Sequence, residues 1–227
     1  MGGGFAVYLY LLLGDQLSMN TSIKTTLRSA TVKDCPTAAR LMQIAADGVC
    51  DYIWSLQQNE FPGLSLLEIG AKRYAEGEGN FSYRNCTLAY TQNSQAQEQI
   101  QGMMMAFAIP DQASEAPSSE SEAEATFPGM EVLAPYSLEQ PNSWYICALA
   151  VFPQYRQQGI GTQLLDLAFE QARERGFPVV SLLCFEQNIG ALRLYQRYGF
   201  ETIAQAIVVP HPLIHHTGNV LLMTKSV

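Results

Sequence analysis

Positive charge is scarce in this chain of 227 residues. It has 13 lysines and arginines against 21 aspartates and glutamates, a formal net charge of −8 and a pI of about 4.8. Such a chain lacks the basic footprint that proteins use to bind nucleic-acid phosphates, so we expect no nucleic-acid partner. A partner selected by the overall field would be a cation, although many acidic proteins are acidic only for solubility.

Paired cysteines are also missing. The chain has five cysteines, an odd number, and no CxxC pair. This pattern is typical of reduced thiols in a cytosolic protein, and it disfavours a disulfide framework or a zinc site. Cys147 and Cys184 lie within apolar, strand-like runs and are interpreted as buried structural thiols. We therefore expect a cytoplasmic protein without a bound metal.

The one conspicuous amino-terminal apolar run is too short to cross a membrane. It covers nine residues, Phe5 to Leu13, whereas a spanning helix needs about 20. No Lys or Arg precedes the run, as one would in a signal peptide, and Ala6 stands where a myristoylation signal has Ser or Thr. We expect residues 1–22 to be an extension, either an extra packed element or the result of a start site ahead of Met19, and no membrane partner.

The hydrophobic content of 48% is enough for a sizeable core, and the length suits one domain with insertions. We expect that domain to span residues 23–227. Residues 111–126 carry five acids and no base, which predicts a solvated loop insertion. The alternative is that this acidic loop guides a cationic substrate.

Strand and helix signals alternate along the chain. Asp34 and Pro36 predict the start of the first helix, and Gly77 the end of the second. The methionines 103–105 are interpreted as core strand residues. The order predicts an α/β (α+β) fold with a mixed, partly parallel central sheet of about six to seven strands flanked by helices. The expected strands are 25–28, 81–91, 100–109, 144–151, 179–184, 200–209 and 219–225, and the expected helices begin near 35, 65, 161 and 188.

The stretch VFPQYRQQGIGTQLL, residues 151–165, joins an apolar strand to an amphipathic helix. The first N–H groups of a helix lack intrahelical partners and carry the positive end of its dipole. Gly159 and Gly161 have no Cβ, and Arg156 adds a positive charge, so the turn suits a diphosphate. It lacks the lysine of a GxxxxGK[ST] loop and the third glycine of a GxGxxG fingerprint.

The longer run ALAVFPQYRQQGIGTQLLDLA resembles the acetyl-CoA pyrophosphate loop of the GCN5-related N-acetyltransferases. Farther on, NIGALRLYQRYGF resembles that family's N-x-x-A-x-x-L-Y-x-x-x-G-F segment. The resemblance covers about residues 144–209 and implies the acyl-CoA N-acyltransferase fold with acetyl-CoA as cosubstrate. The cofactor-binding residues that it implies are Leu149, Ala150, Val151, Arg156, Gln157, Gln158, Gly159, Ile160, Gly161, Thr162 and Asn188.

The resemblance also implies a role for each segment. The main chain of residues 149–151 would pair with the pantetheine arm, and the amides of residues 157–162 would hold the pyrophosphate. Asn188 would bond the pantetheine arm or a water, or else only cap the last helix. Tyr195, two helical turns on, would be the general acid that protonates the leaving thiolate. The alternative for Tyr195 is a core tyrosine.

The general base is left open. Some peptide-modifying relatives place a Glu five residues before the Asn, and this chain has Leu183 there, which counts against a protein amino terminus as acceptor. No spacing rule selects among the other carboxylates, which are Glu131, Glu139 and Glu186. A histidine between the last two strands is a further candidate for base or substrate contact, the alternative being no role. These histidines are His211, His215 and His216.

The sequence therefore predicts transfer of an acetyl group from acetyl-CoA to a primary amine. The acidic surface favours a small cationic acceptor over a lysine or peptide amine. The alternative is a non-catalytic acyl-CoA-binding sensor or scaffold, against which the presence of both Asn188 and Tyr195 counts. Pairing of two copies into a homodimer through their sheets, as in other family members, is also compatible with the sequence.

Overall fold

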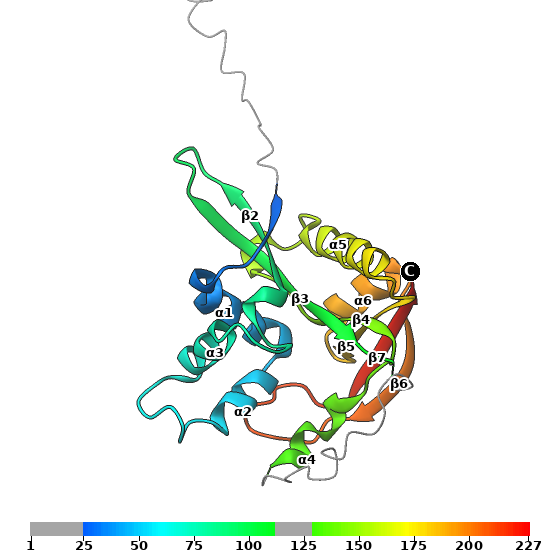
Figure 1. Ribbon diagram of the computed structural model, residues 1–227. Helices are drawn as coiled ribbons and strands as arrows, with labels where there is room; N and C mark the ends of the chain where they lie inside the picture. The colour runs from blue at the N-terminus through cyan, green and yellow to red at the C-terminus, as the bar shows by residue number, and fades with distance from the viewer. Residues whose placement is uncertain (1–24, 112–128) are drawn as a thin grey trace, which may run out of the picture.

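The computed structural model describes residues 25–111 and 129–227 (Figure 1). Seven strands form one sheet in the order β1-β2-β3-β4-β5-β7-β6, with β4 and β5 parallel and the other neighbours antiparallel. The predicted mixed sheet is confirmed. The strands are β1 (Thr26–Ser29), β2 (Cys86–Gln92), β3 (Glu98–Ile109), β4 (Ser143–Val151), β5 (Val179–Phe185), β6 (Glu201–Ile207) and β7 (Asn219–Ser226).

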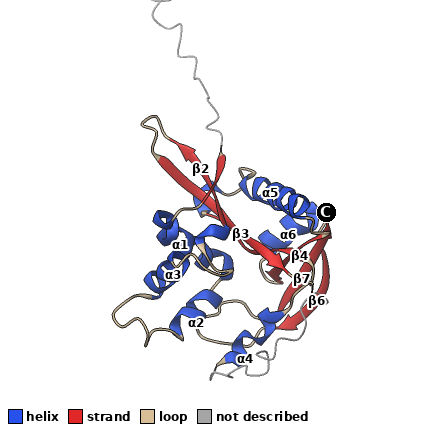
Figure 2. Ribbon diagram, viewed as in Figure 1, coloured by secondary structure: helices blue, strands red, loops and turns tan. Residues whose placement is uncertain are grey.

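Helices cover both faces of the sheet (Figure 2). On one side lie α1 (Cys35–Ala46), α2 (Val49–Ser55) and α3 (Leu66–Ala75), and on the other α5 (Ile160–Arg175) and α6 (Ile189–Tyr198). A short helix, α4 (Met130–Leu133), precedes β4. The predicted extension at 1–22, and the predicted insertion at 111–126 apart from Asp111, lie outside the described residues.

Strand β3 supplies both cores by alternation. Met103 and Met105 pack against α1 and α3, whereas Met104 packs against α5, and none of the three is more than 1% exposed. Successive strand side chains point to opposite faces, so one run of methionines serves two layers. Their interpretation as core residues is confirmed.

Helix boundaries follow local chemistry where the sequence supplies it. Ser65 and Glu68 form a capping box at the start of α3, and Asn188 Oδ1 accepts from Ala191 N at 3.2 Å at the start of α6. Gly199 ends α6 in the left-handed conformation. Helix α5 differs, since no side chain among the described residues caps its first turn.

One predicted strand begins later than expected. The sequence pattern indicated a strand from residue 81, but β2 begins at Cys86, after a 3-10 turn at Tyr83–Asn85. Ser82 Oγ accepts from Arg84 N at 3.2 Å and closes that turn. A local side-chain acceptor offers the backbone an alternative to the sheet ladder, which explains the difference.

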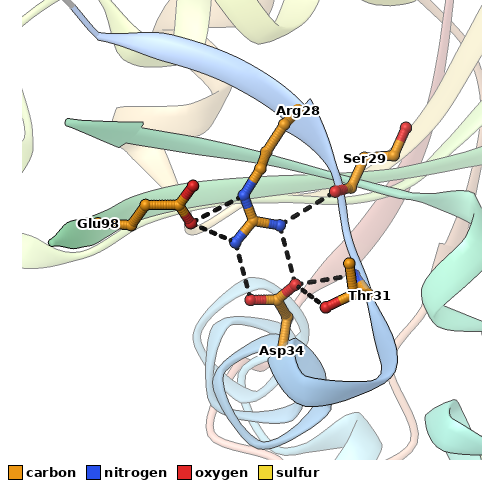
Figure 3. A network of polar contacts seen from close by, with 5 residues as sticks. All are labelled: Arg28, Ser29, Thr31, Asp34 and Glu98. Carbon is orange, nitrogen blue, oxygen red and sulfur yellow. Dashed lines mark hydrogen bonds and ion pairs between the residues drawn. The ribbon is translucent and has the colours of Figure 1, made fainter. Parts of the chain in front are cut away.

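An ion-pair network fastens the outer strand β1 to the rest of the sheet (Figure 3). Arg28 donates to both carboxylate oxygens of Asp34, at 2.9 and 3.0 Å, and reaches Glu98 on β3 at 2.6 Å. Asp34 also accepts from Thr31 N and Oγ1, both at 2.8 Å. Asp34 precedes α1 as predicted, but its carboxylate serves Arg28 and Thr31 instead of capping α1.

Replacement of Asp34 by Asn is expected to lower the free energy of unfolding by about 1 kcal/mol at pH 7. Hydrogen bonds from Arg28 hold the pKa of Asp34 at about 2, below its ordinary 3.8. The ionised carboxylate therefore stabilises the folded chain above pH 3.8, and this contribution is lost as the pH falls toward 2. Urea unfolding at several pH values tests this.

The control for that series is Glu174→Gln, because its ion pair is weak. The Glu174 side chain is 75% exposed, and its carboxylate lies as far as 3.9 Å from the Arg175 guanidinium. It should leave the unfolding free energy unchanged at every pH. Equal stability of the native chain and Asp34→Asn at pH 7 would show that the network contributes nothing.

Candidate active site

Strands β4 and β5 separate halfway along their length. Their parallel pairing ends at Ile146 and Leu182, and the β3–β4 register shifts next to it, which leaves Cys147 as an extra residue on β4. Such a bulge bends the strand that carries it. Residues 148–151 remain paired to β3 on one edge only, so the other edge of β4 presents main-chain groups without a strand partner.

A cavity of about 1220 Å³ extends along this free edge. All the predicted cofactor-binding residues line it except Gln158, whose Nε2 contacts the Gln154 carbonyl oxygen at 3.5 Å. The predicted general acid Tyr195 lines it too. The structure thus brings both sequence motifs together around one cavity. Gly159 precedes α5 and Asn188 precedes α6, and both residues line this cavity.

The turn before α5 is left-handed at two residues, of which one is a glycine. Gln157 and Gly159 have φ of 62° and 81°, whereas Gly161 lies within the helix. A Cβ on Gly161 would lie 3.2 Å from the Leu194 side chain, so this glycine permits α6 to approach closely. Its missing Cβ therefore has a packing reason besides the predicted ligand. The Gly161 and Thr162 N–H groups belong to the uncapped first turn, where helices bind anions.

Arginine side chains line the cavity, and one of them lies beside this turn. Arg156 is exposed, and its Nε donates to the Val151 carbonyl oxygen at 3.1 Å, which holds the guanidinium beside the end of β4. Arg193 and Arg197 of α6 also line the cavity. The Arg156 guanidinium and the uncapped start of α5 make this part of the cavity suitable for a polyanion, despite the net negative charge of the chain.

Tyr195 lies deep in the cavity wall. Its side chain is 6% exposed, and its ring packs edge-on against Phe200 at 5.8 Å. Burial, and secondarily Cys184, raise the pKa of Tyr195 well above its ordinary value. The hydroxyl therefore stays protonated at neutral pH and can donate a hydrogen bond to a developing negative charge.

Carboxylates and aromatic rings also line the cavity. The carboxylates are Asp47 at the end of α1 and the exposed Glu139 before β4. Among the rings, Phe107 and Tyr145 are in edge contact, with centroids 5.4 Å apart. Burial, with smaller effects of Cys147, Glu139 and Tyr195, raises the pKa of Tyr145. Carboxylates and rings together suit a cation with an apolar body.

The structure separates the candidate bases. Glu139 and His216 line the cavity, whereas Glu131 bonds Gly129 N at 3.0 Å and Glu186 bonds Asn219 Nδ2 at 2.9 Å, both outside it. His211 and His215 also lie outside the lining. Leu183 occupies its predicted place on β5 and lines the cavity without a titratable group.

Sequence patterns missed Asp47 and Tyr145. Asp47 ends α1 in the left-handed conformation, with φ of 43°, and Tyr145 lies in an ordinary apolar strand run. Neither belongs to a motif, since each reaches the cavity only through the packing of α1 and β4 against distant segments.

Cys35, Cys86 and Cys184 are buried, whereas Cys50 and Cys147 are partly exposed. Three of the five, Cys50, Cys147 and Cys184, line the cavity. All five are free, and burial is the main factor that raises the pKa of Cys147 and Cys184 to about 12. Their interpretation as structural thiols agrees with this burial.

Among residues 25–111 and 129–227, no cluster of three His, Cys, Asp or Glu could hold a metal ion. In the same ranges, no helix combines the length and apolar character needed to cross a membrane.

The model of the acetyltransferase (GNAT) family matches residues 86–200, from the start of β2 to just past α6 and slightly over half of the chain. The chain belongs to the GNAT acetyltransferase family. The recognition made from the two motifs is confirmed. Members of this family are N-acetyltransferases that use acetyl-CoA.

Individual relatives match this chain either over a short segment or at low sequence identity. An uncharacterised N-acetyltransferase of Methanocaldococcus jannaschii is 45% identical over 65 residues, which is 29% of this chain and 29% of that protein. The chain thus matches less than a third of that relative's length. An agmatine N-acetyltransferase structure is 17% identical, with a TM-score of 0.56 over 89% of this chain and 99% of the other.

A third similar structure is a chain of the NatC complex, solved with a Gag peptide and CoA. It is 13% identical, with a TM-score of 0.52 over 90% of this chain and 99% of the other. At these identities the two structures establish the GNAT fold alone. The acceptors in their names, a small amine in one case and a peptide in the other, belong to those proteins.

Proposed function

We propose that this chain is an acetyl-CoA-dependent N-acetyltransferase that acetylates a small cationic primary amine. One observation carries the proposal. The free edge of β4, the uncapped start of α5 and the protonated Tyr195 line the same cavity, and its lining includes both arginines and carboxylates. A donor with a diphosphate and an acceptor with an ammonium group match these charges.

The donor substrate is held mainly by main chain. The amides of residues 157–162 face the diphosphate, with Arg156, Arg193 and Arg197 around it. The free edge of β4 at residues 148–151 offers main-chain groups to the amides of the pantetheine arm, as a neighbouring strand would. The Asn188 Oδ1 already caps α6, so any contribution to the donor comes from its Nδ2.

The residues of the cavity then promote direct transfer. The amine nitrogen attacks the thioester carbonyl carbon and loses a proton, while the carbon–sulfur bond breaks. Tyr195 donates its hydroxyl proton to the leaving sulfur and recovers it from solvent. Holding donor and acceptor in one cavity supplies the orientation that the bimolecular reaction lacks in water.

The carboxylates and aromatic rings that line the cavity favour an acceptor with both a cationic group and an apolar part. Asp47 and Glu139 provide negative charge for an ammonium group, and Phe107 and Tyr145 provide apolar and cation–π contact. A primary amine with a second cationic group fits this lining better than a peptide amino terminus flanked by neutral groups.

The direct test measures free-thiol release from acetyl-CoA with polyamines, arylalkylamines, aminoglycosides, amino acids and short peptides. Dibasic small amines are expected to give the highest kcat/KM. A preference for peptides would overturn the acceptor class. Tight acetyl-CoA binding without thiol release in the presence of any amine would favour the acyl-CoA sensor over the enzyme.

Replacement of Glu139 by Gln is expected to raise the KM for a dibasic amine about fivefold and leave the KM for acetyl-CoA unchanged. An exposed carboxylate contributes about 1 kcal/mol to ion pairing, which corresponds to that factor. Initial rates with each substrate varied in turn give both constants. Glu131→Gln, from the same segment but outside the cavity lining, is the matched control. Equal amine KM values for the two variants would remove Glu139 from acceptor binding.

A further inference from the structure

We propose that His216, oriented by Asp47, accepts the proton from the acceptor amine during acetyl transfer. The proposal rests on the proposed function and names a proton acceptor for it. His216 belongs to the connection between β6 and β7, and Asp47 lies between α1 and α2, 169 positions earlier in the chain. In Figure 1 the orange connection between β6 and β7 runs beside α2.

The His216 ring is fixed on two sides. Its Nε2 lies 2.8 Å from Asp47 Oδ2, and its plane is tilted over the Phe185 ring with centroids 4.5 Å apart. The side chain is only 18% exposed, yet it lines the cavity. With Nε2–H donated to Asp47, the neutral ring keeps Nδ1 as a proton acceptor. This is the arrangement of an oriented base.

The other two histidines lack this combination. His215 also contacts Asp47, with Nδ1 3.2 Å from Oδ1, but its side chain is 66% exposed and outside the cavity lining. His211 Nδ1 accepts from Leu213 N at 3.2 Å, and its ring packs on Tyr52. His215 is therefore a matched control, since it shares the carboxylate of His216 but not the cavity.

The backbone around Asp47 holds the pair in place. The His215 N–H bonds the Asp47 carbonyl oxygen at 3.4 Å. Gly48 has a φ of 99°, and a Cβ there would lie 1.7 Å from the Leu213 carbonyl oxygen. Only glycine permits so close an approach. The β6–β7 connection is thus seated directly on the α1–α2 corner.

His216 and Tyr195 reach the cavity from opposite faces of the sheet. Phe185, which packs on His216, and Cys184, which lies beside Tyr195, are successive residues of β5 and belong to different cores. The cavity is lined from both faces where β4 and β5 separate. Leu183 shares the Phe185 face of β5 and offers no titratable group. Beside the same ring lies Tyr136, at 5.9 Å from Phe185, with a buried hydroxyl that has no protein partner among the described residues. A polar molecule in the cavity, such as water or the acceptor, would satisfy it.

The charged and titratable groups around His216 are few. Asp47 faces it from the α1–α2 corner, His215 is its chain neighbour, and Tyr136 and Glu139 approach from the segment before β4. Glu139 is exposed, and among the described residues no hydrogen bond or ion pair joins it to the ring, so Asp47 is the group that orients His216. An imidazole is also a better base near neutral pH than a carboxylate, whose ordinary pKa is about 4.

The proton balance is simple. As the amine nitrogen forms its bond to the carbonyl carbon, the nitrogen's proton passes to His216 Nδ1, directly or through one water. Breaking of the carbon–sulfur bond places the electron pair on sulfur, which takes the Tyr195 proton. His216 then loses its proton to solvent, Tyr195 regains one, and an amide and a free thiol remain.

The experiment compares His216→Gln with His215→Gln. We expect the first to lower kcat about 20-fold, to abolish the fall of kcat/KM in acid that we expect for the native chain, and to leave acetyl-CoA affinity by calorimetry unchanged. His215→Gln should retain both the rate and the pH profile. Equal rates and equal profiles for the two variants would overturn the proposal.

Asp47→Asn provides a second readout that a merely structural role would not move. Without the carboxylate the ring loses the partner that holds its Nε2–H and leaves Nδ1 free, so kcat should fall severalfold while the KM for acetyl-CoA is unchanged. A native kcat in a folded variant would show that Asp47 does not orient the base. Absence of thiol release in the native chain with every amine would instead refute the proposed function. Calorimetry shows whether each variant still binds acetyl-CoA, and thermal unfolding shows whether it is folded. Failure of the His216 proposal is thereby distinguished from failure of the proposed function.

Discussion

The Tyr195→Phe variant is expected to turn over on the order of 10²-fold more slowly than the native chain, with nearly unchanged affinity for acetyl-CoA. The substitution removes one hydroxyl and keeps the ring packing against Phe200. Without a proton donor, the sulfur must leave as a thiolate next to buried apolar groups, where a charge is costly. Binding of the donor depends on main-chain groups and arginines that the substitution does not touch.

Tyr198→Phe is the matched control on the same helix. The Tyr198 hydroxyl donates to Asp166 Oδ1 at 2.6 Å and does not line the cavity. Its loss should reduce stability slightly and leave kcat unchanged. Single-turnover thiol release together with calorimetric titration of acetyl-CoA separates the chemical step from binding. Equal turnover of both variants would remove Tyr195 from the mechanism.

The Thr162→Glu variant is expected to weaken acetyl-CoA binding on the order of 10²-fold while the fold stays at least as stable. Thr162 is exposed in the first turn of α5 and lines the cavity. A carboxylate in a first turn interacts favourably with the helix dipole, so stability is maintained. The same carboxylate repels a diphosphate held by that turn, and two like charges about 4 Å apart near a protein surface repel by several kcal/mol.

Thr162→Gln is the neutral control of similar size, and it should bind acetyl-CoA within about twofold of the native chain. The difference between the two variants should shrink as salt increases, because the repulsion is between partly exposed charges. Calorimetric titration of both variants with acetyl-CoA at two ionic strengths measures this difference in affinity. Native affinity in Thr162→Glu would mean that the diphosphate does not lie at the start of α5. This test is cleaner than substitution of Gly161, whose Cβ would also press on Leu194.

Local chemistry explains why much of the donor side could be predicted. The segment from Leu149 to Thr162 is continuous, so its strand, turn and helix arise from neighbouring residues, and Gly159 marks the left-handed position by its identity. Asn188 and Tyr195 lie on one helix with fixed periodicity, so their common side follows from sequence. Family membership followed from the same two segments and is confirmed.

Prediction failed where a side chain had a competing partner. Residues 81–85 carry an apolar and aromatic pattern that favours a strand, but Ser82 closes a turn and delays β2 to Cys86. Asp34 has the identity and position of a cap, but Arg28 and Thr31 bind its carboxylate. Such competition depends on which groups come within reach, and only the folded chain decides that.

The sequence by itself predicted the fold class and the presence of the loop before α5 and Tyr195 in one site, because each prediction depends on residues close together along the chain. The tertiary structure alone decided which other residues line the same cavity. Asp47, Tyr145 and His216 come from three distant segments, and they share one cavity only because β4 separates from β5 and the β6–β7 connection packs on the α1–α2 corner. Long-range packing of this kind has no periodic signature, so a motif could predict the loop before α5 but not the contact between Asp47 and His216.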